Sequence, residues 1–398
     1  MTDPAPPFLR VAIACGGTGG HFFPGLAVAE QLRRCGAAVT LLISPKEVDQ
    51  QALESASGLQ TVTLPAVGLA RGGEMAFIRG FARSYRAAKA AFSPCPPRAA
   101  LAMGGFTSAP PLLAARRLGA WVFLHESNSI PGRANRWLSW FVHRAFVGFA
   151  TAGPRLHTSK VIVTGTPVRS QFQPREAAGC RAALGLHPAG PVLLVMGGSQ
   201  GASAINSLVG NTLPLLAGRF PHWQWLHLAG SAEVEAVKRA YATAGLPAQV
   251  HPFFTSMELA LGAATAAISR AGASSLAELA AMRLPSVLIP YPFATDDHQL
   301  HNARALEATG AARLLEQKAA TPQSLAALLA DLVENPAARL PMQDALARWH
   351  CPQAASHIAQ SILEAIAASS LAPRPQPNCP VSAVSVAAAS SIFSLLLS

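Results

Sequence analysis

Short apolar runs alternate with amphipathic stretches along most of the chain. The run 8–14 is closed by two glycines, and apolar positions at near-helical spacing follow over 24–35, where Pro24 suits a first helical turn. Another apolar run, 39–43, comes next. A strand, a glycine loop, a helix and a strand in this order form a βαβ unit. This order predicts a parallel sheet with helices on its faces.

The same order returns further along the chain. We predict the later elements as strand 99–103, helix 110–118, strand 121–124, strand 192–196, helix 202–216, strand 223–228, strand 266–269, helix 274–282 and strand 287–290. Glycine pairs close two of these strands, at 104–105 and 197–198. The chain is therefore predicted to be an α/β protein built from two similar halves, each opening with a strand and a glycine loop.

From this order we predict three parts. A first Rossmann-like domain is expected over 8–168, a second over 169–368 and a disordered tail over 369–398. The segment 168–188, rich in glycine, proline and charge, is the expected linker. The last residues, 381–398, carry no charge, which leaves a membrane anchor as the alternative for the tail. The ligand site is expected in a cleft between the two domains.

Composition and charge narrow the class of protein. The 398 residues are 51% hydrophobic and 13% charged, which excludes wholesale disorder. A net charge of +11 suits a nucleic acid, an anionic membrane surface or a phosphate-bearing substrate. With 7% aromatic residues and no RNP motif, a nucleic-acid partner is not expected. Six scattered cysteines without a C-x-x-C pair, and an N-terminus unlike a secretory signal, indicate a reducing, cytoplasmic location.

Two glycine-rich loops are candidate phosphate sites. Four glycines lie in the segment 16–20, and glycines there let the backbone approach a phosphate or a sugar closely. The segment is neither a G-x-G-x-x-G loop nor a P-loop. His21 follows it and is a candidate general base, with a purely structural role as the alternative. The loop 197–201 follows the same logic, with three glycines and a hydroxyl donor at Ser199.

Three polar groups follow predicted strands of the sheets. Glu278, one turn into the helix after strand 266–269, could bind ribose hydroxyls or simply stabilise its helix. The cluster 296–299 together with Asn302 invites a metal reading, but its Gln299 and Asn302 suit sugar hydroxyls better, since no second ligand cluster accompanies it. The pair at 125–126 could be acid/base machinery or a hydrogen-bonded structural pair.

A basic amphipathic segment spans 67–92. Its aromatic and apolar residues at 77, 78, 81 and 85 share one helical face and are interleaved with five basic residues. This pattern is typical of a helix that lies on a membrane surface. The alternative is a helix that packs this face into the core.

Seven segments in order resemble one family, the MurG-type UDP-N-acetylglucosamine transferases of peptidoglycan synthesis. They are 16–30, 104–110, 125–139, 164–169, 197–206, 269–292 and 296–312. The resemblance implies a GT-B fold, in which two Rossmann-like domains face each other across a cleft. It also implies inverting transfer of N-acetylglucosamine from the UDP-sugar to undecaprenyl-linked lipid I, which gives lipid II. No cofactor or metal is implied, and such proteins are peripheral on the cytoplasmic face of the membrane.

The resemblance also implies site residues. Carried over by position, the donor-binding residues are Thr18, Gly19, Gly20, Asn128, Arg169, Ser199, Phe254, Ala273, Ser274, Ser275, Leu276, Ala277, Glu278, Gln299 and Asn302. In the family pattern Ser199 binds phosphate, the backbone of Phe254 reads the uracil, and Glu278 binds the ribose. Gln299 and Asn302 address the sugar hydroxyls.

The catalytic assignment is less direct. His21 is the best candidate for the catalytic base, and Glu126 is a second candidate on the acceptor side. Phe106 stands where the family commonly has tyrosine, which weakens any acceptor hydrogen bond there. Ser127 and Met282 also depart from the common pattern.

Other classes of protein fit parts of the pattern. A GT-B transferase with another acceptor, or a UDP-sugar 2-epimerase, would share the architecture. A sugar-nucleotide sensor would bind the donor without releasing UDP. A basic nucleic-acid-binding protein would lose affinity steeply with salt and would not respond to UDP.

Overall fold

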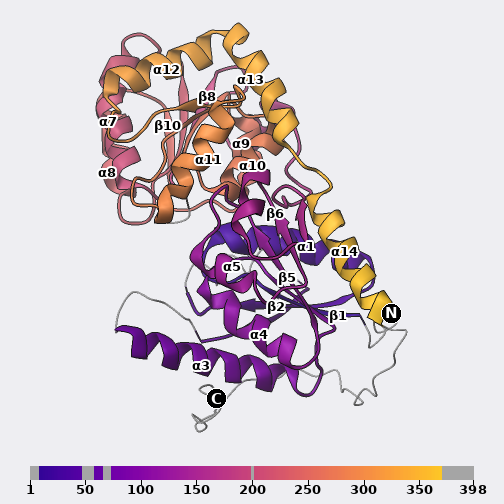
Figure 1. The fold of residues 1–398 in the computed structure, drawn as a ribbon. Coiled ribbons are helices and arrows are strands. Elements are labelled where there is room, and N and C mark those ends of the chain that lie inside the picture. Colours follow the sequence, from indigo (N-terminus) through magenta and orange to yellow (C-terminus); the bar gives the residue numbers. More distant parts are fainter. Residues whose placement is uncertain (1–8, 47–57, 66–72, 199–200, 370–398) are drawn as a thin grey trace.

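The protein consists of two parallel β-sheets, each flanked by helices, one above the other in Figure 1. The computed structural model describes residues 9–46, 58–65, 73–198 and 201–369. The seven-stranded sheet has the order β3-β2-β1-β4-β5-β6-β7. Its strands are β1 (Arg10–Ala14), β2 (Ala38–Ile43), β3 (Gln60–Thr63), β4 (Ala99–Ala102), β5 (Trp121–Glu126), β6 (Arg144–Val147) and β7 (Val161–Val163). We call this sheet and the elements packed on it the first domain.

Helices cover both faces of the first sheet. They are α1 (Gly19–Arg34), α3 (Gly73–Phe92), α4 (Ala109–Arg117) and α5 (Arg133–Leu138), with short 3₁₀ turns over Phe106–Ser108 and Ala150–Arg155. Helix α1 begins at Gly19, so the prediction that Pro24 lies in its first turn is wrong. The chain already turns helical at the glycines, and the amides of His21 and Phe22 bond to the carbonyl of Thr18.

The six-stranded sheet has the order β10-β9-β8-β11-β12-β13. Its strands are β8 (Val192–Met196), β9 (Gln224–Leu228), β10 (Ala248–His251), β11 (Ala266–Ser269), β12 (Ser286–Leu288) and β13 (Arg313–Leu314). Its helices are α6 (Ala177–Ala183), α7 (Ser203–Ala217), α8 (Val234–Ala244), α9 (Met257–Ala263), α10 (Ala273–Met282), α11 (His298–Glu307), α12 (Pro322–Glu334) and α13 (Pro336–Trp349). We call this sheet and the elements packed on it the second domain.

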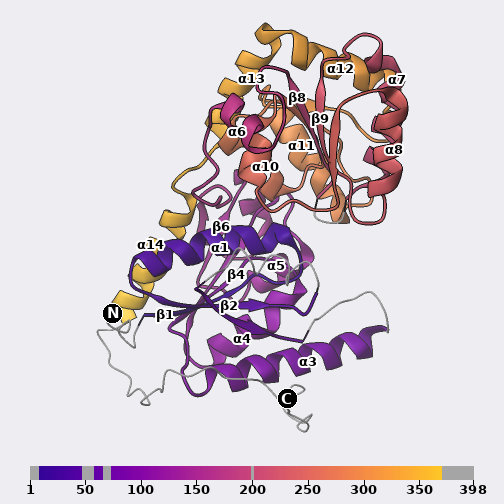
Figure 2. The same cartoon turned by 180° about the vertical axis from the view of Figure 1, so that it is seen from behind.

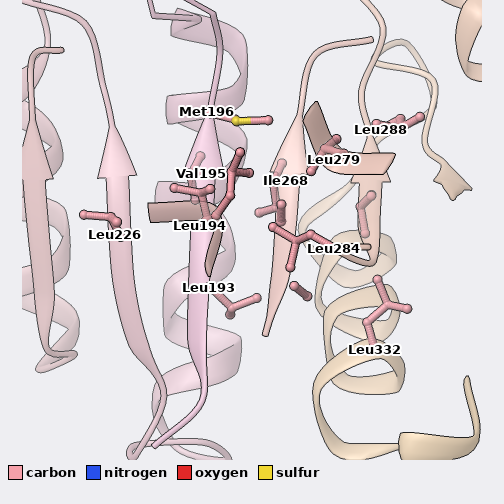
Figure 3. Close-up of a cluster of buried hydrophobic side chains, with 14 of the residues drawn as sticks. Leu193, Leu194, Val195, Met196, Leu226, Ile268, Leu279, Leu284, Leu288 and Leu332 are labelled. Atoms are coloured by element: carbon pink, nitrogen blue, oxygen red, sulfur yellow. The ribbon is translucent and has the colours of Figure 1, made fainter. Parts of the chain in front are cut away.

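The core of the second domain explains why its strands read as continuous apolar runs. Every residue of β8 is buried, because helices cover both faces of this central strand. Figure 3 shows Leu194 and Val195 of β8 beside Ile268 of β11. Leu279 of α10 and Leu332 of α12 belong to the same buried cluster. The predicted α/β class with parallel sheets is thus confirmed.

The predicted linker over 168–188 contains a helix of the second domain. Glu176 caps α6, since its carboxylate accepts from the amides of Ala178 and Gly179. Arg181 donates from Nε to the carbonyl of Ala263 at 2.8 Å, which ties α6 to the end of α9. Glu176, which indicated a linker by its charge, is therefore a helix cap, and Arg181 connects two helices of the second domain. The prediction of a linker is wrong for this part of 168–188.

Helix α14 (Ala354–Ser369) lies within the range predicted for the second domain but packs against the first. It is the yellow helix beside α1 in Figures 1 and 2. Ile358, Ile362 and Ile366 are buried in one cluster with residues of α1 and β1. The chain thus crosses between the domains twice. The boundary after residue 168 stays a prediction.

The amphipathic helix α3 divides its apolar residues between core and surface. Phe81 and Tyr85 pack against the buried cluster of the first domain, whereas Ile78 is 48% exposed. Packing into the core is therefore confirmed for Phe81 and Tyr85, and contact of this helix with a membrane stays a prediction. Within the described ranges, no helix has the length and apolar character needed to cross a bilayer. The predicted tail, apart from Ser369, lies outside the described residues.

Candidate functional site

A cavity of about 680 Å³ lies between the two domains, at the carboxyl ends of both sheets. Loops after β1, β4 and β5 face the loops after β8, β10 and β11 across it. The cavity is where parallel α/β sheets bind ligands. Its lining includes most of the predicted residues: Thr18, Gly19, Gly20, His21, Glu126, Asn128, Arg169, Phe254, Ala273, Ser274, Ser275, Glu278 and Gln299. Leu276, Ala277 and Asn302 are not among the lining residues, and Ser199 lies outside the described part of the chain.

His21 is held at the cavity by two glycines. Its Nδ1 lies 3.2 Å from the Thr18 hydroxyl oxygen. A Cβ on Gly104 would lie 2.7 Å from His21 Nε2, and one on Gly105 would lie 3.3 Å from the ring. Both glycines also have positive φ, at 125° and 74°, which side chains rarely adopt. The predicted glycine pair after β4 therefore makes room for the imidazole.

Glu126 ends β5 and is only 3% exposed. Its carboxylate accepts four hydrogen bonds, from the amide and side chain of Asn128, the amide of Gly132 and the side chain of Asn135, at 2.9–3.1 Å. Burial raises the pKa of Glu126, and these four bonds act against that shift. With both oxygens engaged, the carboxylate orients the loop after β5, which makes it a weaker candidate for a base than His21.

His125 has a separate set of partners. Its Nε2–H donates to the Gly165 carbonyl at 3.1 Å, so its Nδ1 accepts from the Ser127 hydroxyl at 3.2 Å. Full burial lowers the pKa of His125 to about 4, so the ring is neutral near pH 7. Since His125 and Glu126 bond to different groups, the structure favours the structural role over a joint acid/base role.

A proline in α1 creates a contact across the cavity. Pro24 has no N–H, so the carbonyl of Gly20, four residues earlier, lacks its helical donor. The hydroxyl of Ser274, at the start of α10, donates to this carbonyl at 2.8 Å. The hydrogen bond from the Ser274 hydroxyl to the Gly20 carbonyl thus holds the two loops together.

The start of α10 offers backbone donors to the cavity. Gly272 caps the helix without a side-chain hydrogen bond, so the first N–H groups have no capping partner from it. Gly197 and Gly198, after the neighbouring strand β8, line the same cavity. Helix N-termini and glycine turns of this kind bind phosphate groups.

Arg169 and Glu278 are two charged side chains that line the cavity. Arg169 is 5% exposed, and its guanidinium lies over the rings of Phe23 and Phe172 at 4.3 and 4.9 Å. Burial lowers the pKa of Arg169. Burial also raises the pKa of Glu278 to about 7; Arg169 opposes this rise and Glu258 adds to it. Ligand-free protein therefore holds Glu278 partly protonated at neutral pH.

The raised pKa of Glu278 predicts a pH-dependent effect of Glu278→Gln on stability. As the pH rises from 4.5 to about 7, the unfolded side chain ionises while the folded one keeps its proton, so the folded state loses stability over this window. Glutamine does not titrate. We expect the variant to gain about 1–3 kcal/mol over wild type between pH 5 and pH 8. Urea unfolding of ligand-free protein measures this gain, and an equal difference at both pH values would contradict it.

The segment after β12 contributes in ways the sequence did not indicate. Asp296 and Asp297 adopt left-handed conformations, with φ of 52° and 51°. Asp296 pairs with Arg136 of the first domain at 2.8 Å. Gln299 accepts from the amide of Tyr291 at 3.0 Å, so its NH₂ is the group left to face a ligand hydroxyl.

Arg270 is a lining residue that we did not single out. It is 8% exposed and donates from Nη1 to the carbonyls of Ile289 and Pro290 at 3.0 and 3.1 Å. Its position directly after β11 is the signal that could have identified it, because that edge of the sheet carries the site.

Comparisons with known proteins agree with this geometry. The glycosyltransferase family 28 N-terminal domain matches residues 11–147, and the family's C-terminal domain matches residues 192–361. Two relatives carry the name UDP-N-acetylglucosamine--N-acetylmuramyl-(pentapeptide) pyrophosphoryl-undecaprenol N-acetylglucosamine transferase. The one from Sorangium cellulosum is 39% identical over 367 residues, covering 89% of this chain and 88% of the relative. The one from Acidithiobacillus ferrooxidans is 38% identical over 362 residues, covering 89% and 97%.

Solved structures show the same architecture. The crystal structure of Acinetobacter baumannii MurG superimposes with a TM-score of 0.68 at 29% identity, covering 89% of this chain and 99% of that one. The calicheamicin glycosyltransferase shares the fold alone, with a TM-score of 0.62 at 17% identity over 92% of this chain and 99% of that one. Two parallel sheets facing each other across a ligand cavity define a GT-B protein. The family matches go further, and the chain belongs to glycosyltransferase family 28.

Proposed function

We propose that the protein transfers N-acetylglucosamine from UDP-N-acetylglucosamine to the C4 hydroxyl of undecaprenyl-diphosphoryl-N-acetylmuramoyl-pentapeptide. The product is lipid II, formed with inversion at the anomeric carbon. The observation that carries this proposal is the 38–39% identity, over about nine tenths of the chain, to relatives named for that reaction. The function would place the protein in peptidoglycan synthesis, and so in cell-wall growth, cell shape and division.

The donor is proposed to lie along the second domain. Backbone groups at Phe254 contact the uracil, and Glu278 accepts from the ribose hydroxyls. The diphosphate lies between Gly197–Gly198 and the start of α10, with Arg169 beside it, and Gln299 faces the sugar. This assignment is supported by the shared lining of one cavity. Ser274 would exchange its bond to Gly20 for a phosphate oxygen, since its single hydroxyl proton serves one acceptor at a time.

The chemistry is proposed to be one in-line displacement. The acceptor C4 oxygen attacks the anomeric carbon as the bond to the UDP oxygen breaks, and His21 takes the hydroxyl proton. Negative charge gathers on the departing diphosphate. Backbone N–H groups after β8 and at α10, together with Arg169, stabilise that charge because they are fixed before reaction. These donors meet the electrostatic demand, so we propose no resident cofactor or metal.

The first domain is proposed to contact the cytoplasmic face of the cell membrane. Its large exposed apolar side chains include Met75, Ile78, Trp137 and Trp140, which are 42–64% exposed. The rings of Phe81 on α3 and Trp137 on α5 are 6.3 Å apart, so the two helices share one surface. Exposed arginines on α3 add positive charge there. Apolar side chains beside basic ones are typical of peripheral binding to anionic lipid.

Removing this apolar surface should weaken membrane binding. We expect Ile78→Ser combined with Trp140→Ser to lower the affinity for anionic vesicles about tenfold or more, because buried apolar area sets such binding. Co-sedimentation measures it. Leu340→Ser, which removes a 60% exposed leucine from the second domain, is the matched control. Equal binding by the double variant and the control would refute the assigned surface.

The proposed reaction is tested by measuring UDP release with and without a short-chain lipid I analogue. Release that requires the analogue supports the proposal. Turnover of UDP-N-acetylglucosamine without acceptor would indicate an epimerase. Binding without release would indicate a sensor, and release with another acceptor would indicate a different GT-B transferase.

A further inference from the structure

Asn302, on α11, makes three of its four hydrogen bonds across the domain boundary. Its side-chain oxygen accepts from both the amide and the hydroxyl of Ser129, each at 2.9 Å. Its NH₂ donates to the side-chain oxygen of Asn128 at 3.0 Å and to the Ala271 carbonyl at 3.2 Å. The residue is 0% exposed. A side-chain amide has two donors and two acceptor sites, so none remains for a sugar hydroxyl.

The contact with Asn128 continues into the first domain. Asn128 donates from its side chain to Glu126 at 3.1 Å, and its amide donates to the same oxygen at 2.9 Å. Asn302 therefore holds one end of the Asn128 amide while Glu126 holds the other. Asn128 lines the cavity and Asn302 does not. The orientation of a cavity residue in the first domain thus depends on a buried amide of the second.

We propose that Asn302 is a positioning residue that joins the two domains and orients Asn128 toward the donor, and not a sugar contact. Breaking a buried, fully satisfied amide leaves several polar groups without partners on both sides of the boundary. The two loops would then separate or rearrange even when no ligand is bound. The inference rests on the proposed donor site and assigns how that site is assembled.

Hydrogen exchange in ligand-free protein tests the bridge directly. The Ser129 amide donates to Asn302, so Asn302→Ala should speed its exchange about tenfold or more. The same variant should weaken binding of UDP, which has no sugar, about 5- to 50-fold in calorimetry, the range set by leaving buried groups unpaired. His301→Ala, on the exposed side of the same helix, is the matched control and should change neither value.

Ser129→Ala tests the same bridge from the other side, in case Asn302→Ala fails to fold. It removes one bond to Asn302 and leaves the backbone bond, so we expect a loss of UDP affinity of a few fold. Combined with Asn302→Ala, its effect should be less than additive, because both variants remove one shared contact.

Two results would overturn the proposal. One is unchanged exchange at Ser129 in Asn302→Ala. The other is a variant that binds UDP normally and loses affinity only for UDP-N-acetylglucosamine, as a sugar contact would. Neither measurement uses an acceptor, so the failure of this bridge is distinguishable from an error in the proposed reaction, which would appear as no lipid-dependent UDP release by wild type.

Discussion

Replacing His21 with alanine is expected to slow turnover about 100- to 10,000-fold, the range for loss of a general base. The imidazole faces the cavity from the start of α1, and glycines at 104 and 105 make room for it. Glu126 also lines the cavity, but its carboxylate accepts four hydrogen bonds. Steady-state UDP release with saturating donor and acceptor measures the effect.

The controls separate chemistry from folding. His357→Ala removes an exposed histidine from α14 and should leave turnover unchanged. Donor affinity in His21→Ala should stay within a few fold of wild type, because the lost group acts on the acceptor hydroxyl. Near-normal turnover by a folded His21→Ala protein would remove this residue from the role of base.

Glu278→Ala is expected to weaken donor binding by about 1.5–3 kcal/mol, the scale of hydrogen bonds to a charged group. Calorimetry with UDP measures the loss. A 2′,3′-dideoxyribose analogue of UDP sharpens the experiment, because it has no hydroxyls for the carboxylate. The penalty of the substitution should therefore vanish with that analogue.

The matched control is Glu316→Ala, which removes an exposed carboxylate that pairs with Arg304 and does not line the cavity. An unchanged UDP affinity in Glu278→Ala would show that the ribose assignment is wrong. A loss of affinity that persists with the dideoxyribose analogue would instead show that Glu278 acts through Arg169 on binding of the diphosphate.

The sequence predicts most of the central strands but fewer of the contacts that assemble the site. The run 192–196 is apolar throughout and ends at glycines, so β8 and the loop after it could be predicted from local signals alone. Asn302 could not be placed, because its partner Ser129 is 173 positions away and sequence pattern says nothing of such pairing. For the same reason the sequence motif predicts a sugar contact at Asn302 but does not reveal its hydrogen bonds to Ser129 and Asn128.

Helix α14 illustrates a second limit. Its apolar positions predict a buried face, yet they do not indicate which of two similar sheets that face covers. Conversely, the glycine, proline and charge of 168–188 predict a linker, because the sequence does not distinguish a capping carboxylate such as Glu176 from a solvent-exposed one. Short edge strands such as β13 carry too few residues to show any periodicity.

The position of α14 has a consequence for synthesis. The first sheet and α1 leave the ribosome early, but the helix α14 that covers them is made only after the whole second domain. Until then the apolar strip that α14 buries is exposed to solvent, where it can attract other chains or a chaperone. A fragment that stops after residue 168 would keep this exposed strip permanently. The first domain should therefore be expressed on its own only with α14 joined back to it, for example through a circular permutation of the gene.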